Sequence, residues 1–140
     1  MKRIFQPDSP YKTVAMVLAI GWTVLIFILF MMPGSGMPKV RIPLPFADKW
    51  IHAGFFAVFC FLWMAANPCR DRGYARLLWV TSLCFGWVVE FLQGYLSYGR
   101  SHDYMDLLAD GVGSLMGIGL FRGVAAWVEK RSASPSLDRP

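Results

Sequence analysis

The chain contains four apolar stretches that are each long enough to cross a lipid bilayer. Residues 14–32 carry no charged side chain, and residues 50–66 carry a single histidine, His52, without Asp, Glu, Lys or Arg. Residues 77–97 carry only Glu90, and residues 107–128 carry only Asp110 and Arg122. Because about 20 apolar residues span the hydrocarbon core of a bilayer, the pattern predicts an all-α integral membrane four-helix bundle.

These stretches also predict the domain organisation. We expect a single membrane domain over residues 1–140, with helices at about 14–32, 49–66, 77–97 and 105–128 and a polar tail at 129–140. The chain is 16% charged, whereas a typical soluble domain is about 25% charged. Residues 14–32 exceed the apolar core of a cleaved signal, which is about 7–15 residues long. We therefore interpret this stretch as a retained anchor.

Basic residues are distributed unequally between the two ends of the expected helices. One side carries most of them, and the other side carries few: Lys2, Arg3, Lys12, Arg70, Arg72, Arg76, Arg122, Lys130, Arg131 and Arg139 against Lys39, Arg41, Lys49 and Arg100. Because cytoplasmic loops are enriched in Lys and Arg, this bias predicts a multi-pass protein of the inner (plasma) membrane with cytoplasmic N- and C-termini. It also accounts for the net charge of +5, so we expect the lipid bilayer as partner and no nucleic acid.

The last stretch carries acids and glycines on one helical face. Asp106, Asp110, Gly113 and Gly117 follow one another at intervals of four, three and four, which keeps them on the same side of a helix. Gly113 and Gly117 predict helix packing, because two small residues four apart let a partner helix approach closely. The two acids are therefore expected to face protein rather than lipid.

Polar residues also mark the starts of the second and fourth helices. Asp48 and His52 are four residues apart and share a face, and Asp48 is expected as the N-cap. Ser101 is expected to cap the fourth helix, with Asp103 in its first turn, where the helix dipole favours a negative charge. Capping alone therefore accounts for Asp103.

The polar residues of three helices are expected to meet at one depth. Glu90 and Gln93 lie near the end of the third helix, while the second and fourth helices start on that same side. With a rise of about 1.5 Å per residue, His52, Glu90 and Asp110 fall about 6–12 Å below the outer surface. Intramembrane ionisable residues are candidates for function; the alternative for Glu90 is a protonated carboxyl that bonds a neighbouring helix.

Chemical roles follow from residue type. Proton transfer is assigned to His52, Glu90, Asp106 and Asp110, and ligand binding to Asp48, Lys49, Gln93, Arg100 and Asp103. The acids outnumber Lys49 and Arg100, so protonation, a histidinium or a bound cation must balance the remaining charge. Anion recognition is also expected, because two helix N-termini open outward beside Lys49 and Arg100.

Two other chemistries lack their usual sequence motifs in this chain. His52 with carboxylates suits zinc or manganese, but no metal-binding spacing such as HExxH is present. No GxSxG motif or Cys–His pairing supports nucleophilic catalysis. We therefore expect neither a metal nor a cofactor, and whether the protein is an enzyme stays open.

Three of these patterns resemble the VanZ-like family of small membrane proteins. They are Asp48-Lys49-x-x-His52, then Glu90-x-x-Gln93, then Arg100-x-x-Asp103-x-x-Asp106 with Gly113 and Gly117, within about residues 46–120. The family more often has Asn where this chain has Asp110. The resemblance implies a protein of the bacterial cell envelope, because the family's named member contributes to low-level teicoplanin resistance.

The favoured hypothesis is an envelope protein that binds or modifies the headgroup of an outer-leaflet phospholipid or lipid-linked glycan. In it, Arg100 and Lys49 hold the anion, and His52, Glu90 and Asp106 transfer protons. One alternative is a non-catalytic accessory subunit whose polar cluster stabilises the bundle. The other is a small transporter, for which polar residues would have to continue toward the cytoplasm.

Overall fold

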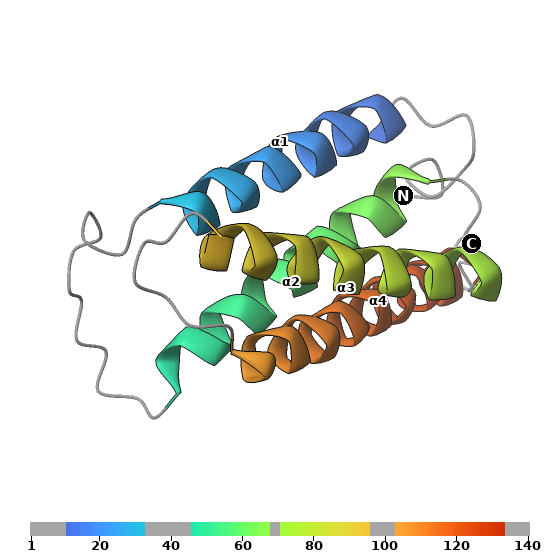
Figure 1. Ribbon diagram of the computed structural model, residues 1–140. Coiled ribbons are helices and arrows are strands. Elements are labelled where there is room, and N and C mark those ends of the chain that lie inside the picture. Colours follow the sequence, from blue (N-terminus) through green and yellow to red (C-terminus); the bar gives the residue numbers. More distant parts are fainter. Residues whose placement is uncertain (1–10, 33–45, 68–70, 96–102, 134–140) are drawn as a thin grey trace, which may run out of the picture.

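The computed structural model describes residues 11–32, 46–67, 71–95 and 103–133. They form four helices, α1 (Tyr11–Met31), α2 (Ala47–Ala66), α3 (Arg72–Tyr95) and α4 (Tyr104–Ala133). Each helix is long and apolar enough to span a membrane, so the described part of the chain is an all-α protein with four candidate transmembrane helices. Successive helices run in opposite directions (Figure 1), and α2 and α4 therefore begin where α1 and α3 end.

Two helix starts differ from expectation because the capping residues differ. α3 begins at Arg72, five residues before the expected start, because Asp71 accepts a hydrogen bond from the Tyr74 backbone amide at 2.6 Å. Asp48 is not the N-cap of α2: it lies in the first turn, and the N-cap position is held by Phe46 without a side-chain cap. Phe46 has a left-handed backbone with φ of 58°.

α4 is longer than the expected helix of residues 105–128. It continues to Ala133, so the first part of the expected polar tail at 129–140 is helical. Glu129, Lys130 and Arg131 are good helix formers, and basic side chains in a last turn complement the helix dipole. The apolar stretch therefore ends where these charged residues begin, whereas the helix continues through them.

The closest packing in the bundle is between α2 and α4. A Cβ atom built on Gly113 would lie 2.1 Å from the backbone oxygen of Ala53, and one on Gly117 would lie 2.1 Å from that of Ala57. The two backbones thus touch at two successive turns, at positions where only glycine fits. This contact fixes the face of α4 that carries Asp106 and Asp110 against α2.

Aromatic side chains fill the centre of the bundle. Phe56 and Phe121 are fully or almost fully buried, and the rings of Phe59 and Phe85 stack at 5.8 Å between centroids. α1 joins this core through polar links as well, since the Trp22 indole donates a hydrogen bond to the Phe55 carbonyl oxygen at 3.0 Å. The apolar core fills the bundle from the level of the acids toward its opposite end.

Candidate functional site

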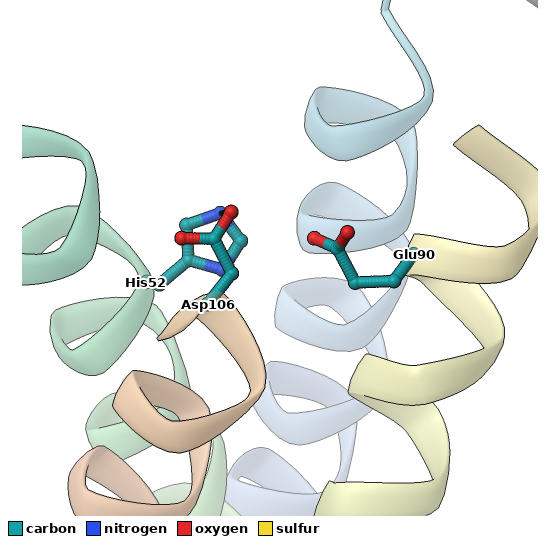
Figure 2. A group of neighbouring side chains, drawn as sticks. All are labelled: His52, Glu90 and Asp106. Carbon is teal, nitrogen blue, oxygen red and sulfur yellow. Dashed lines mark ion pairs between the residues drawn. The ribbon is translucent and has the colours of Figure 1, made fainter. Parts of the chain in front are cut away.

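Acidic and basic side chains gather at the end of the bundle where α2 and α4 begin. We call them the polar cluster, and this end the cluster end: Asp48, Lys49, His52, Glu90, Asp103, Asp106 and Asp110. His52 comes from α2, Glu90 from α3 and Asp106 from α4, and one ligand atom from each lies within 4.8 Å of the other two. Figure 2 shows the Glu90 carboxylate extending toward the other two side chains. Three separate helices therefore supply one site.

Lys49 occupies the centre of an ion-pair network. Its ammonium contacts Asp48 Oδ2 at 2.9 Å and Asp106 Oδ1 at 2.5 Å, and it also pairs with Asp103. The Lys49 side chain is only 18% exposed, and three carboxylates surround it. Its charge is thus already balanced inside the protein, which does not favour its expected role in holding an anion.

Asp103 links the start of α4 to α2. Its Oδ1 accepts a hydrogen bond from the Met105 backbone amide at 2.9 Å, which makes Asp103 the N-cap of α4 and not a first-turn residue. Its other oxygen pairs with Lys49. The hydrogen bond from the Lys49 ammonium lowers the pKa of the Asp103 carboxyl below its ordinary value. The expected cap, Ser101, lies outside the described residues.

His52 and Asp110 form the most deeply buried part of the polar cluster. His52 is 5% exposed and Asp110 is 1% exposed, and His52 Nδ1 lies 3.0 Å from Asp110 Oδ1. The Phe30 ring stacks on the imidazole at 4.5 Å between centroids. Gly86 makes room for the acid, because a Cβ atom there would lie 2.5 Å from Asp110 Oδ2. The imidazole is therefore held by one hydrogen bond and one ring face.

Gln93 supports the fold beside this site. It is buried, and its side-chain amide donates a hydrogen bond to the Phe30 carbonyl oxygen at 2.5 Å. Phe30 lies in the last turn of α1, where carbonyl groups lack partners within the helix. The donor that was expected to bind a ligand thus caps α1.

Two hollows adjoin the polar cluster. One has a volume of about 220 Å³ and is lined by Glu90 and Asp103 together with aromatic side chains such as Trp87 and Tyr104. The other, of about 420 Å³, runs between α2 and α4 and has almost entirely apolar walls, with Lys49 among its lining residues. The cluster end therefore offers polar groups next to an apolar groove.

Sequence reasoning missed a second polar group deeper in the bundle. Ser82 Oγ donates to Ser114 Oγ at 2.8 Å, and Ser114 Oγ lies 2.7 Å from the Asp110 carbonyl oxygen. Both serines are fully buried. Ser114 follows Asp110 by four residues, so its position on the same face was a usable signal. The contact of Phe30 with His52 could not be predicted in this way, because α1 shows no polar stripe.

Arg100 lies outside the described residues, so its expected role stays a prediction. Within the described part of the chain, five carboxyl groups face one ammonium and one imidazole: Asp48, Glu90, Asp103, Asp106 and Asp110 against Lys49 and His52. Such an arrangement suits proton exchange or the binding of a positive group.

Comparisons with known proteins give no further assignment. No family model, no curated protein and no solved structure matches this chain. The resemblance to the VanZ-like family therefore stays a prediction that rests on the motifs quoted above.

Proposed function

We propose that this protein is a cell-envelope membrane protein that binds the headgroup of an outer-leaflet phospholipid or lipid-linked glycan at the polar cluster. The observation that carries the proposal is the meeting of His52, Glu90 and Asp106, from three helices, within 4.8 Å. Intramembrane ionisable groups are costly, and they mark functional sites in many membrane proteins.

The two hollows support an amphiphilic ligand. The smaller one exposes Glu90 and Asp103 to a headgroup, and their carboxylates accept hydrogen bonds from hydroxyl or amino groups. The apolar groove between α2 and α4 starts at Lys49 and passes along Trp50 and Val112, so it fits an acyl or prenyl chain. Polar and apolar parts of one lipid would thus each have a place around the start of α4, whose residues line both hollows.

The distribution of charge supports an outward-facing cluster in the inner membrane. In the described helices, basic residues gather at the end opposite the cluster, where Arg122 Nη2 lies 3.5 Å from the Asp71 carbonyl oxygen at the start of α3. Lys12, Arg72 and Arg76 also lie near helix starts at that end. Since positive residues stay in the cytoplasm, the proposed topology puts both termini there.

Bound lipid tests this function directly. The full chain is purified in mild detergent, and its co-purifying lipids are quantified by native mass spectrometry. The proposal expects a specific lipid class on the wild type and its loss in Glu90→Gln, with retention in the matched control Glu129→Gln, since Glu129 is an exposed acid near the other end of α4. Equal lipid content in the two variants would contradict it.

A second candidate is a non-catalytic subunit whose polar cluster stabilises the bundle. It is favoured by the observation that the main polar contacts join different helices, as in Lys49–Asp106 and His52–Asp110. In that case Glu90→Gln leaves lipid content unchanged, and pull-down from native membranes returns a protein partner.

Glycopeptide resistance is a further part of the proposal, and the family resemblance alone supports it. Deleting the gene from its host should lower the teicoplanin concentration that stops growth. Complementation with wild type restores resistance and complementation with Glu90→Gln does not, if the polar cluster is the working site.

A further inference from the structure

We propose that His52, Glu90 and Asp106 bind a divalent transition-metal ion of the zinc or manganese class. One ligand atom from each residue lies within 4.8 Å of the others. Atoms that bind one zinc ion at about 2.0–2.2 Å lie about 3–3.5 Å apart in a tetrahedral site. Glu90 is only partly buried, so its flexible side chain can close the remaining distance. The proposal revises our expectation that the chain holds no metal.

The histidine is what separates this group from an ordinary cluster of acids. His52 is 95% buried, with 5% of its surface exposed. Nδ1 lies 3.0 Å from Asp110 Oδ1, and in the neutral tautomer that donates from Nδ1 to this oxygen, Nε2 keeps its lone pair. Among the described residues, the nearest acid oxygen to Nε2 is Asp106 Oδ2 at 3.9 Å, beyond hydrogen-bond distance. The Nε2 lone pair is thus available on the side of Asp106.

Two of the three proposed ligands are also oriented by a further partner. Asp110 holds His52, and Lys49 holds Oδ1 of Asp106. Metal-binding histidines and carboxylates have such partners in proteins, and the carboxylate–histidine–metal arrangement is a recurring one. We do not propose a metal at the second acidic group, Asp48, Asp103 and Asp106, because the Lys49 ammonium already occupies its centre.

The donor set indicates which ions fit. One imidazole nitrogen with two carboxylates suits zinc, manganese or iron, whereas calcium and magnesium prefer oxygen ligands alone. A divalent ion would also offset part of the excess negative charge of the polar cluster. An ion with three protein ligands keeps at least one position open, where a headgroup phosphate oxygen could bind; that last step rests on the proposed function.

Metal titration tests the site without any lipid. The full chain in detergent is stripped with a chelator and titrated with Mn²⁺ by electron paramagnetic resonance, and with Zn²⁺ by competition against a colorimetric chelator. The wild type should bind one ion per chain. Asp110→Asn should weaken binding by about 10–100-fold, Glu90→Gln, which removes a ligand, by at least as much, and Glu129→Gln should bind like the wild type. Absence of stoichiometric binding by the wild type, or equal binding by all four proteins, would overturn the proposal.

Lipid content, measured on the same samples, separates the two claims. Lipid that stays bound after chelation, in a protein that takes up no metal, would overturn the metal site and leave the proposed function standing. Stoichiometric metal binding without a specific bound lipid would overturn the proposed function and leave the metal site standing. Thermal unfolding of each variant shows that it is folded, and the partly exposed position of Glu90 makes Glu90→Gln the mildest change.

A different observation carries a second site at the opposite end, where we also infer that an anionic phospholipid headgroup binds. Arg72 and Arg76 of α3 and Arg122 of α4 line a cavity of about 500 Å³, together with Trp79 and apolar side chains. No acid is among its lining residues in the described part of the chain. Basic pockets between transmembrane helices on the cytoplasmic side suit phosphate headgroups, and arginine pairs with phosphate through two hydrogen bonds.

Lipid retention tests this second site. The full chain in detergent is mixed with phosphatidylglycerol, phosphatidylcholine or inorganic phosphate, and bound lipid is measured by native mass spectrometry. Arg76→Gln with Arg122→Gln should lower phosphatidylglycerol affinity by about fivefold per arginine, from about 1 kcal/mol each. Lys130→Gln with Arg131→Gln, which lie outside the cavity, should have little effect. Equal loss in both pairs, equal retention of both lipids, or displacement by inorganic phosphate would overturn the inference.

Discussion

The Lys49 ammonium lies 2.5 Å from Asp106 Oδ1, and this ion pair joins the first turn of α2 to the first turn of α4. The Lys49 side chain is 18% exposed and that of Asp106 is 12% exposed, so water screens the pair only in part. Asp106 keeps its second oxygen on the side of His52. One carboxylate therefore connects the network around Lys49 to the proposed metal site.

Lys49→Met should destabilise the bundle. It leaves the largely buried Asp106 carboxylate without its partner, and losing a hydrogen bond to a charged group costs about 1.5–3 kcal/mol. Unfolding of the detergent-solubilised protein measures the change. Lys130→Met is the matched control, because Lys130 is exposed in the last turn of α4. If both variants unfold at the wild-type temperature, the network does not stabilise the bundle.

Asp103→Asn should have an effect that depends on pH. Asn remains a good N-cap, so the variant removes the charge and keeps the cap. The Lys49 ammonium lowers the pKa of Asp103, and the resulting stabilisation is fully present above the ordinary Asp pKa of about 3.9. It is lost as the pH falls through the lower pKa of the folded state. The difference in melting temperature between wild type and variant should therefore be constant near neutral pH and shrink in acid; a difference that grows in acid would contradict this.

Gly117→Ala should force α2 and α4 apart. The new Cβ atom would lie 2.1 Å from the Ala57 carbonyl oxygen, and such overpacking costs about 1–3 kcal/mol. Gly119→Ala is the control on the same helix, because nothing lies within 4 Å of a Cβ atom there. We expect Gly119→Ala to be neutral or slightly stabilising. Similar melting temperatures for the two variants would rule out the close α2–α4 contact.

Gln93→Leu should loosen the end of α1. The buried amide donates to the Phe30 carbonyl oxygen, and losing one hydrogen bond with its buried acceptor costs about 1–3 kcal/mol. Hydrogen exchange should increase in the last turn of α1 and not elsewhere. Thr81→Val serves as control, since the Thr81 hydroxyl bonds only the Leu77 carbonyl of its own helix at 2.9 Å among the described contacts. Unchanged exchange at α1 would mean that Gln93 does not hold this helix.

The helices could be predicted because length and hydropathy determine them directly. Absence of charge over 14–32 and only one or two ionisable residues in each of the other three stretches were sufficient to find four candidate transmembrane helices. The exact helix ends were harder to predict. A single side chain caps a helix, and other residues that could serve as the cap lie close to it in the sequence. Asp71 caps α3 and Asp103 caps α4, while Asp48, which looked similar, lies inside the first turn of α2.

The candidate site could be predicted only in part from the sequence, for a related reason. Helical spacing indicates which residues share a face, so Asp106 and Asp110 could be grouped with Gly113 before any coordinates. It does not indicate which neighbour each side chain meets. The partner of Gln93 is a backbone oxygen of α1, and the stack on His52 comes from Phe30; apolar stretches carry no mark for such contacts.

Cross-linking is the most direct test that α2, α3 and α4 bring their polar residues to one place. In a background where Cys60, Cys69 and Cys84 are replaced by Ala, the pair Glu90→Cys with Asp106→Cys is treated in native membranes with a short thiol-reactive linker. The linked peptide should form efficiently, as should the one from Glu90→Cys with His52→Cys. Glu90→Cys with Leu108→Cys should stay unlinked, because Leu108 is 62% exposed on another face of α4. Equal linking of Glu90→Cys to positions 106 and 108, or linking to neither, would contradict the site.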